Sequence, residues 1–443
     1  MLYVYNTRGK VLRHVQTAMK IKLFRIAIMG LLGSLISIQA ANGAPDWNKS
    51  LGNSINWLSM SGDGNVIFTG TFAFTNWGNF TVASFNKSGT MLWQDNDFTN
   101  FYEGVNWTGI SRDGQYAAAG GWVATATHQG FLRAYATGTG ARLLDDRPPG
   151  RVEGIALSTN GTWLVSASED LRLYQLRFLR FPILVWNSKI VPNIHVPWWN
   201  WLIPIWKTCI FYTPTSTNAP SGDTFHTVAM SGDGHWIVAG GSAGKVRLFE
   251  NQSNTLVLTE LWQTNASTYY AQFVDMTPDG NWFAVAYLDG HVEMFNRASF
   301  ASTDKPVWDY TVNTTGKKVW SVHVATNGTE VAAASLELGG SGGGICMIQN
   351  KAGSGGTYTP NLLWNFPTIK GPNPGLGMDD NNQYVVGADG YNSAGHFYLL
   401  NAVTGAQIWD YATSTMNWPI AISGDGHSIA GGGDSGIVYH WQN

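Results

Sequence analysis

A four-residue turn recurs along most of the chain and constrains its fold more than any other sequence feature. Most copies end in Asp-Gly or Asn-Gly, residues that adopt the positive φ angles of a tight hairpin turn at little cost. An apolar run precedes each turn, and a second run follows it and ends in small residues, as in residues 236–240. This pattern predicts a repeated β-hairpin. The eight turns begin at Ser61, Ser111, Ser158, Ser231, Thr277, Ala325, Asp379 and Ser423.

Two further strands complete each predicted repeat. A third apolar run follows the hairpin, and a tryptophan before the next turn marks a fourth strand. Four short strands in a repeat of roughly 40 to 50 residues are typical of a β-propeller blade. We therefore predict an all-β, eight-bladed β-propeller of four-stranded blades over residues 45–443. The fourth-strand markers are Trp93, Trp262, Trp308, Trp364 and Trp409, with Leu144 in the same place and Trp206 in the one long repeat.

The two ends of the repeated region complement one another. Trp47 has the position of a fourth-strand tryptophan, but no first three strands come before it. The last repeat stops after its third strand, which contains Trp441. Pairing the N-terminal strand with the C-terminal blade removes two exposed sheet edges, so we expect this pairing to close the propeller.

The repeat between Gly161 and Gly234 is longer than the others and holds an apolar, tryptophan-rich insertion at about 179–204. We expect it between the third and fourth strands of that repeat. Exposed tryptophans would give a protein partner a large, rigid contact area, and they also favour a bilayer surface. The alternative is that the insertion folds against the propeller. The candidate surface residues are Trp186, Trp198, Trp199 and Trp201.

Residues 1–44 predict a targeting segment. Met19 begins a short basic stretch, an apolar run follows at 23–38, and small residues continue to Ala44. This is the pattern of a secretory signal peptide, with cleavage expected after Ala40 or Ala44. We therefore expect a secreted or periplasmic protein. The alternative is a protein anchored to a membrane by an uncleaved signal.

Composition narrows the range of partners and activities. Charged residues are 12% of the chain and the net charge is −3, so nucleic acid is not an expected partner. The sequence lacks a Gly-x-Ser-x-Gly motif and a phosphate-binding loop, and no two histidines share metal-ligand spacing on one element. We predict no cofactor, no metal and no catalytic set. Cys209 and Cys346 fall in different repeats and are expected to remain unpaired.

Two segments resemble known propeller families. Residues 231–250 resemble the WD-repeat pattern, and residues 400–409 resemble the tryptophan-docking motif of quinoprotein-like (PQQ-like) eight-bladed propellers, with a looser copy at 86–93. The resemblance covers about residues 45–443 and implies the propeller fold. Likeness to the quinoprotein dehydrogenases would also imply a quinone cofactor, a calcium-like ion in the central channel and a carboxylate base.

Three functions are consistent with these features. The first is an exported, non-enzymatic protein-interaction or scaffold module in the periplasm or cell envelope. The second is small-molecule or glycan binding at the channel mouth, where the first strands begin and polar and indole groups could bind a sugar; alternatively, these groups only cap a water-filled channel. The third is a PQQ-dependent dehydrogenase. The mouth residues are Asn56, Asn106, Glu153, His226, Gln272, Trp320, Pro374 and Trp418.

Overall fold

The computed structural model describes residues 43–443 except 74–79, 99–100, 102, 125–128, 177–182, 188–223, 253–256, 265–268, 304, 313–317, 337–341 and 392. The chain divides into two compact units, Met1–Gly43 and Ala44–Asn443, and the described secondary structure lies in the second. Within the described residues, no helix is long and apolar enough to cross a membrane.

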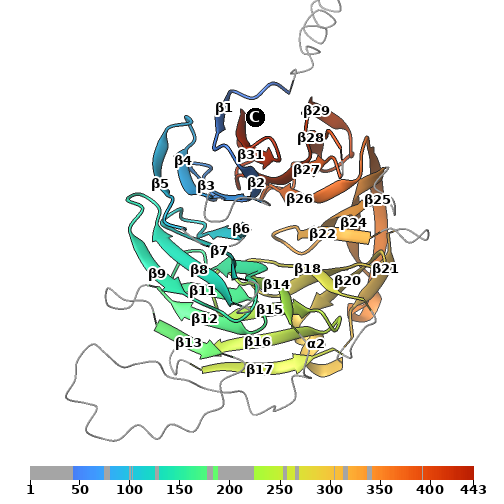
Figure 1. Cartoon of the computed structure of the whole chain (residues 1–443). Coiled ribbons are helices and arrows are strands. Elements are labelled where there is room, and N and C mark those ends of the chain that lie inside the picture. The colour runs from blue at the N-terminus through green and yellow to red at the C-terminus, as the bar shows by residue number, and fades with distance from the viewer. Residues whose placement is uncertain are drawn as a thin grey trace, which may run out of the picture. The chain divides into compact units, whose positions relative to one another are not determined.

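Antiparallel strands make up nearly all of this unit, and they follow the predicted repeat of four. Among the described strands, six sheets have four strands, and a seventh joins two groups of four through a single pair between Phe72 and Gly104. A short helix, α2 (Arg297–Thr303), and a 3-10 turn, η3 (Ser354–Gly356), lie between strands. Figure 1 shows β2, β6, β18 and β22 on the inside and β5, β9, β13, β17, β21, β25 and β29 on the outside.

The first four groups, each in chain order, have the following strands. They are β2 (Ser54–Met60), β3 (Val66–Phe72), β4 (Val82–Asn86), β5 (Met91–Asp95); β6 (Gly104–Ile110), β7 (Tyr116–Ala124), β8 (Gln129–Ala136), β9 (Arg142–Asp146); β10 (Gly154–Leu157), β11 (Trp163–Ala167), β12 (Leu171–Gln175), β13 (Ile183–Asn187); and β14 (Phe225–Met230), β15 (Trp236–Gly241), β16 (Val246–Gln252), β17 (Val257–Gln263).

The remaining groups include the N-terminal strand, which joins the last of them. They are β18 (Ala271–Met276), β19 (Trp282–Tyr287), β20 (His291–Asn296), β21 (Trp308–Thr311); β22 (Lys318–Val324), β23 (Glu330–Leu336), β24 (Gly343–Ala352), β25 (Tyr358–Thr368); β26 (Pro372–Met378), β27 (Tyr384–Asp389), β28 (His396–Asn401), β29 (Gln407–Ala412); and β30 (Asn417–Ile422), β31 (Ser428–Gly433), β32 (Ile437–Gln442), β1 (Trp47–Ser50).

Side chains of the recurring turn hold each hairpin in place. The Ser61 hydroxyl donates to Asp63 Oδ1 (2.6 Å) and accepts the backbone N–H of Val66 (3.0 Å). Gly64 takes the positive φ of 68° that the turn requires. The same serine–aspartate bond recurs at 111–113, 231–233 and 423–425. The polar side chains of the turn hydrogen-bond backbone groups that the chain reversal leaves without a partner. These residues therefore recur, and the turn can be recognised in the sequence.

Small residues in the second strands let neighbouring sheets approach closely. A Cβ atom at Gly70 would lie 2.3 Å from Cγ1 of Val105, and one at Gly120 would lie 2.5 Å from Cγ1 of Val152. The first strands of successive groups also contact one another, and β30 of the last group contacts β2 of the first. Glycine is needed at these positions because the next sheet occupies the space of a side chain.

Three fourth-strand tryptophans join their group to the next in the same way. The indole N–H of Trp47 donates to the carbonyl of Lys87 (2.9 Å), and that of Trp364 donates to the carbonyl of Ala402 (2.7 Å). Trp93 donates in the same way to Thr137. Each ring lies against a turn glycine of positive φ, namely Gly89, Gly405 and Gly140. A side chain on any of these glycines would displace the ring.

Buried polar contacts also join sheets. Asp146, at the end of β9, accepts the hydroxyl of Tyr174 (2.5 Å) and pairs with Arg172 (2.6 Å), both on β12. Asp95 at the end of β5 pairs in the same way with Tyr135 of β8 (2.8 Å). Burial alone would raise the pKa of Asp146, but the Tyr174 hydrogen bond and the Arg172 charge outweigh it and lower the pKa.

The N-terminal strand lies in the last sheet. β1 pairs antiparallel with β32, in a register that places Trp47 opposite His440 and Ser50 opposite Ile437. The Trp47 ring stacks on the His440 ring, with centroids 5.1 Å apart. Trp47 therefore contacts the last group through β1 and the first group through its indole.

One strand assignment from the sequence is wrong. The fourth strand of the third group is β13, which lies within the expected insertion and places Trp186 opposite Leu173; Trp206 is outside the described residues. The apolar run at 183–187 follows β12 after a short connection, and a short loop costs less entropy to close than one reaching Trp206. The extra residues of this repeat therefore follow the fourth strand rather than precede it.

We expect Trp47→Ala to lower the free energy of unfolding by about 2 kcal/mol, because it removes a half-buried ring and its hydrogen bond from between the first and last groups. Lys49→Ala, on the same strand but exposed, is the matched control and should change it by less than about 0.5 kcal/mol. Urea unfolding followed by tryptophan fluorescence and circular dichroism measures both. Equal stability of the two variants would contradict this role for Trp47.

We expect Asp146→Asn to lower the free energy of unfolding by about 1–2 kcal/mol at pH 7, a value that allows for partial solvent exposure of the carboxylate. Because folding lowers the pKa of Asp146, its contribution is complete above the unfolded value of about 3.9 and is lost as pH falls through the folded pKa. Urea unfolding of both proteins between pH 7 and pH 2 should therefore give curves that converge in acid. A difference that persists at pH 2 would argue against this origin.

Candidate functional site

β-Bulges near the start of the first strands present the predicted mouth residues. The register of each first strand with its neighbour shifts across Asn56, Asn106, His226, Gln272, Trp320, Pro374 or Trp418. Glu153 lies just before β10, and its N–H donates to Ala167 (2.9 Å). A bulge redirects a side chain out of the regular alternation of the strand. We refer to this end of the first strands as the bulge end, and to the opposite end as the turn end.

The structure brings two neighbouring pairs of these residues into contact. The Asn56 amide donates to the Asn106 carbonyl (3.3 Å), and the Asn106 amide donates to the Val152 carbonyl (3.4 Å). Glu153 and His226 form a close carboxylate–imidazole contact. Four of the eight residues are thus joined in sequence order around the bulge end.

The other predicted residues have different neighbours. The Trp418 indole donates to Asp434 (2.8 Å), which also accepts the hydroxyl of Ser54 (2.7 Å). Trp320 lies 6.4 Å from the ring of Tyr391, and its buried indole N–H has no hydrogen-bond partner among the described residues. Gln272 and Pro374 lie at the bulges of β18 and β26.

A cavity of about 320 Å³ opens beside Glu153 at the bulge end. The sequence identified only Glu153 among its lining residues. Arg151 lies two residues before Glu153, and this spacing is the one sequence signal that could have identified Arg151 as a lining residue. The lining residues are Glu103, Trp122, Gly150, Arg151, Glu153, Ser168, Glu169, Thr224 and Phe225.

Charged groups dominate this cavity. Arg151 pairs with Glu153 (2.9 Å) and lies 3.6 Å from Glu103, with its guanidinium 5.9 Å from the Trp122 ring. Burial alone would raise the pKa of Glu153, but the contacts with His226 and Arg151 outweigh it and hold the pKa below its usual value. The Glu153 carboxylate is therefore ionised at neutral pH and rigidly held.

Aromatic rings from distant groups meet between the two ends of the first strands. Trp57 and Trp107 stack with ring centroids 3.7 Å apart, and Phe273 from the fifth group lies 5.5 Å from Trp107 and 6.5 Å from Trp57. Each ring directly follows a bulge residue in the sequence. Sequence reasoning missed this aromatic plug, although three repeats share the signal of an aromatic residue after the mouth position.

The turn end has a cavity of its own. It measures about 260 Å³ and is lined by the last residues of all eight first strands and by the turns that follow them. A salt bridge between Arg112 and Asp380 crosses it. Gly62 and Gly424 lie between these two residues in the order of the groups, and a Cβ atom on Gly424 would collide with both side chains. The glycines leave room for the salt bridge.

A chain of hydrogen bonds between turns surrounds this second cavity. Asp380 N–H donates to Gly424 (3.0 Å), Gly424 to Gly62 (2.8 Å), and Gly62 to Arg112 (2.8 Å). The chain runs on through Thr159 and Gly232 to the carbonyl of Pro278. The backbone chain stops at Pro278, because proline has no N–H to donate to the next turn. The turn of the sixth group is linked to that of the seventh by the Thr326 hydroxyl, which donates to the Asp380 carbonyl (3.0 Å).

The expected surface tryptophans are not placed. Trp198, Trp199 and Trp201 lie outside the described residues, and so does the side chain of Trp186, whose backbone belongs to β13. Cys209 is also outside them, while Cys346 is a buried free thiol whose pKa burial raises to about 12.

The residues at the bulge end do not fit the quinone and calcium centre that the quinoprotein resemblance implies. A calcium ion needs several free oxygen ligands, but the Glu153 carboxylate is already bound by Arg151 and His226. The side-chain oxygen Oδ1 of Asn106 accepts a hydrogen bond from the Asn56 amide (3.4 Å). We therefore derive no reaction step through such a centre.

Comparisons with known proteins bear on the fold. No protein-family model matches the sequence, and no curated protein matches it significantly. Among solved structures, the chain is similar to the β-propeller domain of Cps50 (Swd1) from Myceliophteria thermophila, with a TM-score of 0.54 and 11% identity, over 76% of this chain and 96% of that one. Together with the four-stranded antiparallel sheets, this likeness confirms the expected WD-repeat-like β-propeller fold.

Proposed function

We propose that the protein is an exported, non-enzymatic, eight-bladed β-propeller, closed by its N-terminal strand, that acts as a protein-interaction or scaffold module in the periplasm or cell envelope. The blade number is supported by the eight first strands that line the turn-end cavity. The pairing of β1 with β32 and the contact of β30 with β2 support closure. A closed propeller is a rigid frame that presents fixed surfaces.

The cavity beside Glu153 is the observation that carries the proposed binding role. Three glutamates and one arginine line it, so its lining has an excess of negative charge. Trp122 adds an aromatic wall, and its buried indole N–H has no partner among the described residues. Such a cavity suits a lysine or arginine side chain of a partner protein, because the net negative charge of its lining attracts a cation and an aromatic face does so as well.

A small polar ligand such as a glycan is the second candidate for the same cavity. The observation that favours it is that the buried indole N–H of Trp122, which lines the cavity, lacks a hydrogen-bond partner among the described residues. A sugar hydroxyl could accept such a donor while the sugar ring stacks on the indole. The two candidates differ in salt dependence, because only the cationic partner is held by charge.

Export rests on the pattern of residues 1–44 alone. The basic start at Met19, the apolar stretch and the small residues before Ala44 support a secretory signal, and an uncleaved membrane anchor stays the alternative. Contact of the tryptophan-rich residues with a protein or a membrane surface also remains a proposal.

We expect Glu153→Gln to reduce recovery of a bound partner at least fivefold, because it removes the fixed charge of the cavity. Proteins cross-linked in the native envelope fraction and quantified by mass spectrometry give the measurement, and Lys351→Ala, exposed on β24, is the control. Deletion of residues 190–203 tests the tryptophan-rich segment separately while leaving β13 intact. Equal recovery with Glu153→Gln and the wild type would exclude the cavity, and loss only with the deletion would move the contact to that segment.

We expect the mature protein to begin directly after Ala40 or Ala44. Intact-mass spectrometry of the protein purified from the soluble envelope fraction of its native host measures this. An uncleaved chain in the membrane fraction would support the anchored alternative, whereas an uncleaved chain in the cytosol would contradict export.

A further inference from the structure

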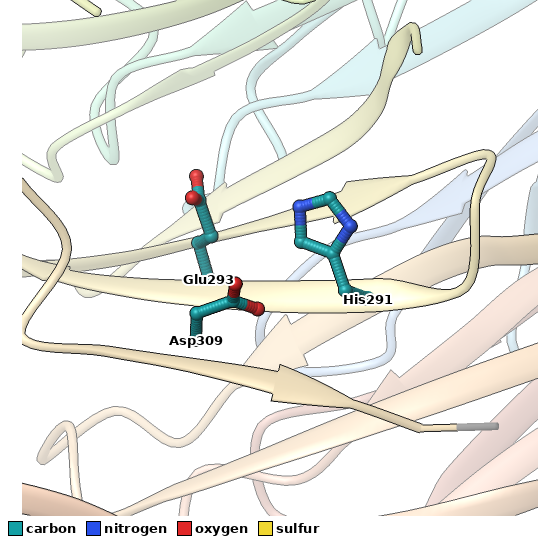
Figure 2. A group of neighbouring side chains, drawn as sticks. All are labelled: His291, Glu293 and Asp309. Carbon is teal, nitrogen blue, oxygen red and sulfur yellow. The ribbon is translucent and has the colours of Figure 1, made fainter. Parts of the chain in front are cut away.

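His291, Glu293 and Asp309 meet on the third and fourth strands of the fifth group rather than on the first strands that carry the mouth residues. His291 and Glu293 alternate along β20 and therefore project from the same face. Asp309 on β21 is directly opposite Glu293 in the strand register, which places it on that face as well. Their ligand atoms all lie within 4.8 Å of one another, and Figure 2 shows the three side chains gathered over the two strands.

Two of these side chains are oriented by residues outside the trio. Asp289, in the turn before β20, contacts Nδ1 of His291. A hydrogen bond donated from Nδ1 leaves the lone pair on Nε2, and Figure 2 shows one ring nitrogen on the side of Glu293 and the other turned away from it. The hydroxyl of Tyr287 donates to Oε2 of Glu293 (2.7 Å), and its ring stacks on His291 with centroids 4.3 Å apart. Carboxylate and hydroxyl groups orient metal ligands in this way.

The charges at this position are unbalanced. Asp289, Glu293 and Asp309 bring three carboxylates together, and none of them forms an ion pair with a lysine or arginine of the described chain. Like charges this close repel one another. A bound cation would relieve this repulsion.

We propose that His291, Glu293 and Asp309 form a binding site for a divalent first-row transition-metal ion, with Zn²⁺ as the best fit. An imidazole nitrogen favours zinc over magnesium or calcium, which prefer oxygen ligands alone. Three protein ligands leave one position of a tetrahedral zinc ion for water or for a group from a partner. The ion would also tie β21, a strand of four residues, to β20.

This site does not depend on the proposed interaction function. It lies on the third and fourth strands, whereas the cavity beside Glu153 lies at the first strands and their connections. Failure of either proposal therefore leaves the other untouched.

The test is zinc binding by tag-free, chelator-treated full-length protein. We expect isothermal titration with Zn²⁺ to give one equivalent with a micromolar or tighter Kd, and His291→Ala and Asp309→Asn each to weaken it at least 30-fold. Asp309 is exposed, so its amide variant should fold normally, as circular dichroism can verify. His235→Ala is the matched control, because His235 pairs with Glu250 (3.2 Å) but has no third ligand group among the described residues.

A second readout tests the coordination directly. Co²⁺ in place of Zn²⁺ should give visible ligand-field absorption bands that are lost in His291→Ala and kept in His235→Ala. Zinc binding that is unchanged in His291→Ala, or lost equally in His235→Ala, would overturn the site. Tighter binding of Ca²⁺ or Mg²⁺ than of Zn²⁺ would overturn the assignment of the ion.

Discussion

The pairing of β1 with β32 is the contact on which the rest of the arrangement depends. It joins residues from the two ends of the described chain and gives the last sheet its fourth strand. Trp47 extends this link, because its indole bonds to Lys87 in the first group while its strand belongs to the last. Contacts between β30 and β2 and the hydrogen bond from Gly424 to Gly62 join the same two groups.

Different interactions hold the two ends of the first strands in place. At the turn end, backbone hydrogen bonds between turns and the Arg112–Asp380 salt bridge fix the spacing, and glycines leave room for that bridge. At the bulge end, bulges redirect the mouth side chains of seven first strands, and a cavity lies beside Glu153. The rings of Trp57, Trp107 and Phe273 lie between the two ends. Each end therefore has a cavity with charged side chains, and the two cavities differ in how those side chains are held.

Only strand pairing brings the candidate metal ligands together. His291 and Glu293 are two residues apart and look unremarkable in the sequence, which carries no paired histidines of metal-ligand spacing. Asp309 follows after an intervening helix, α2, and the β20–β21 register places it opposite Glu293. The prediction of no metal site came from a search for ligands on one element, whereas the proposed site takes its ligands from two strands.

Local chemistry made the repeat and the turns readable from the sequence: six of the eight turns pair a serine or threonine with an aspartate or asparagine, small residues follow, and most fourth strands carry a tryptophan. The sequence also located the bulge residues, since their distance from the turn is nearly constant. Tertiary structure alone decided that Ile183–Asn187 rather than the run near Trp206 forms a fourth strand, because competition between two apolar runs depends on loop closure and packing. It alone placed Arg151 beside Glu103 and Phe273 beside Trp107, since contacts between residues distant in the chain leave no local pattern.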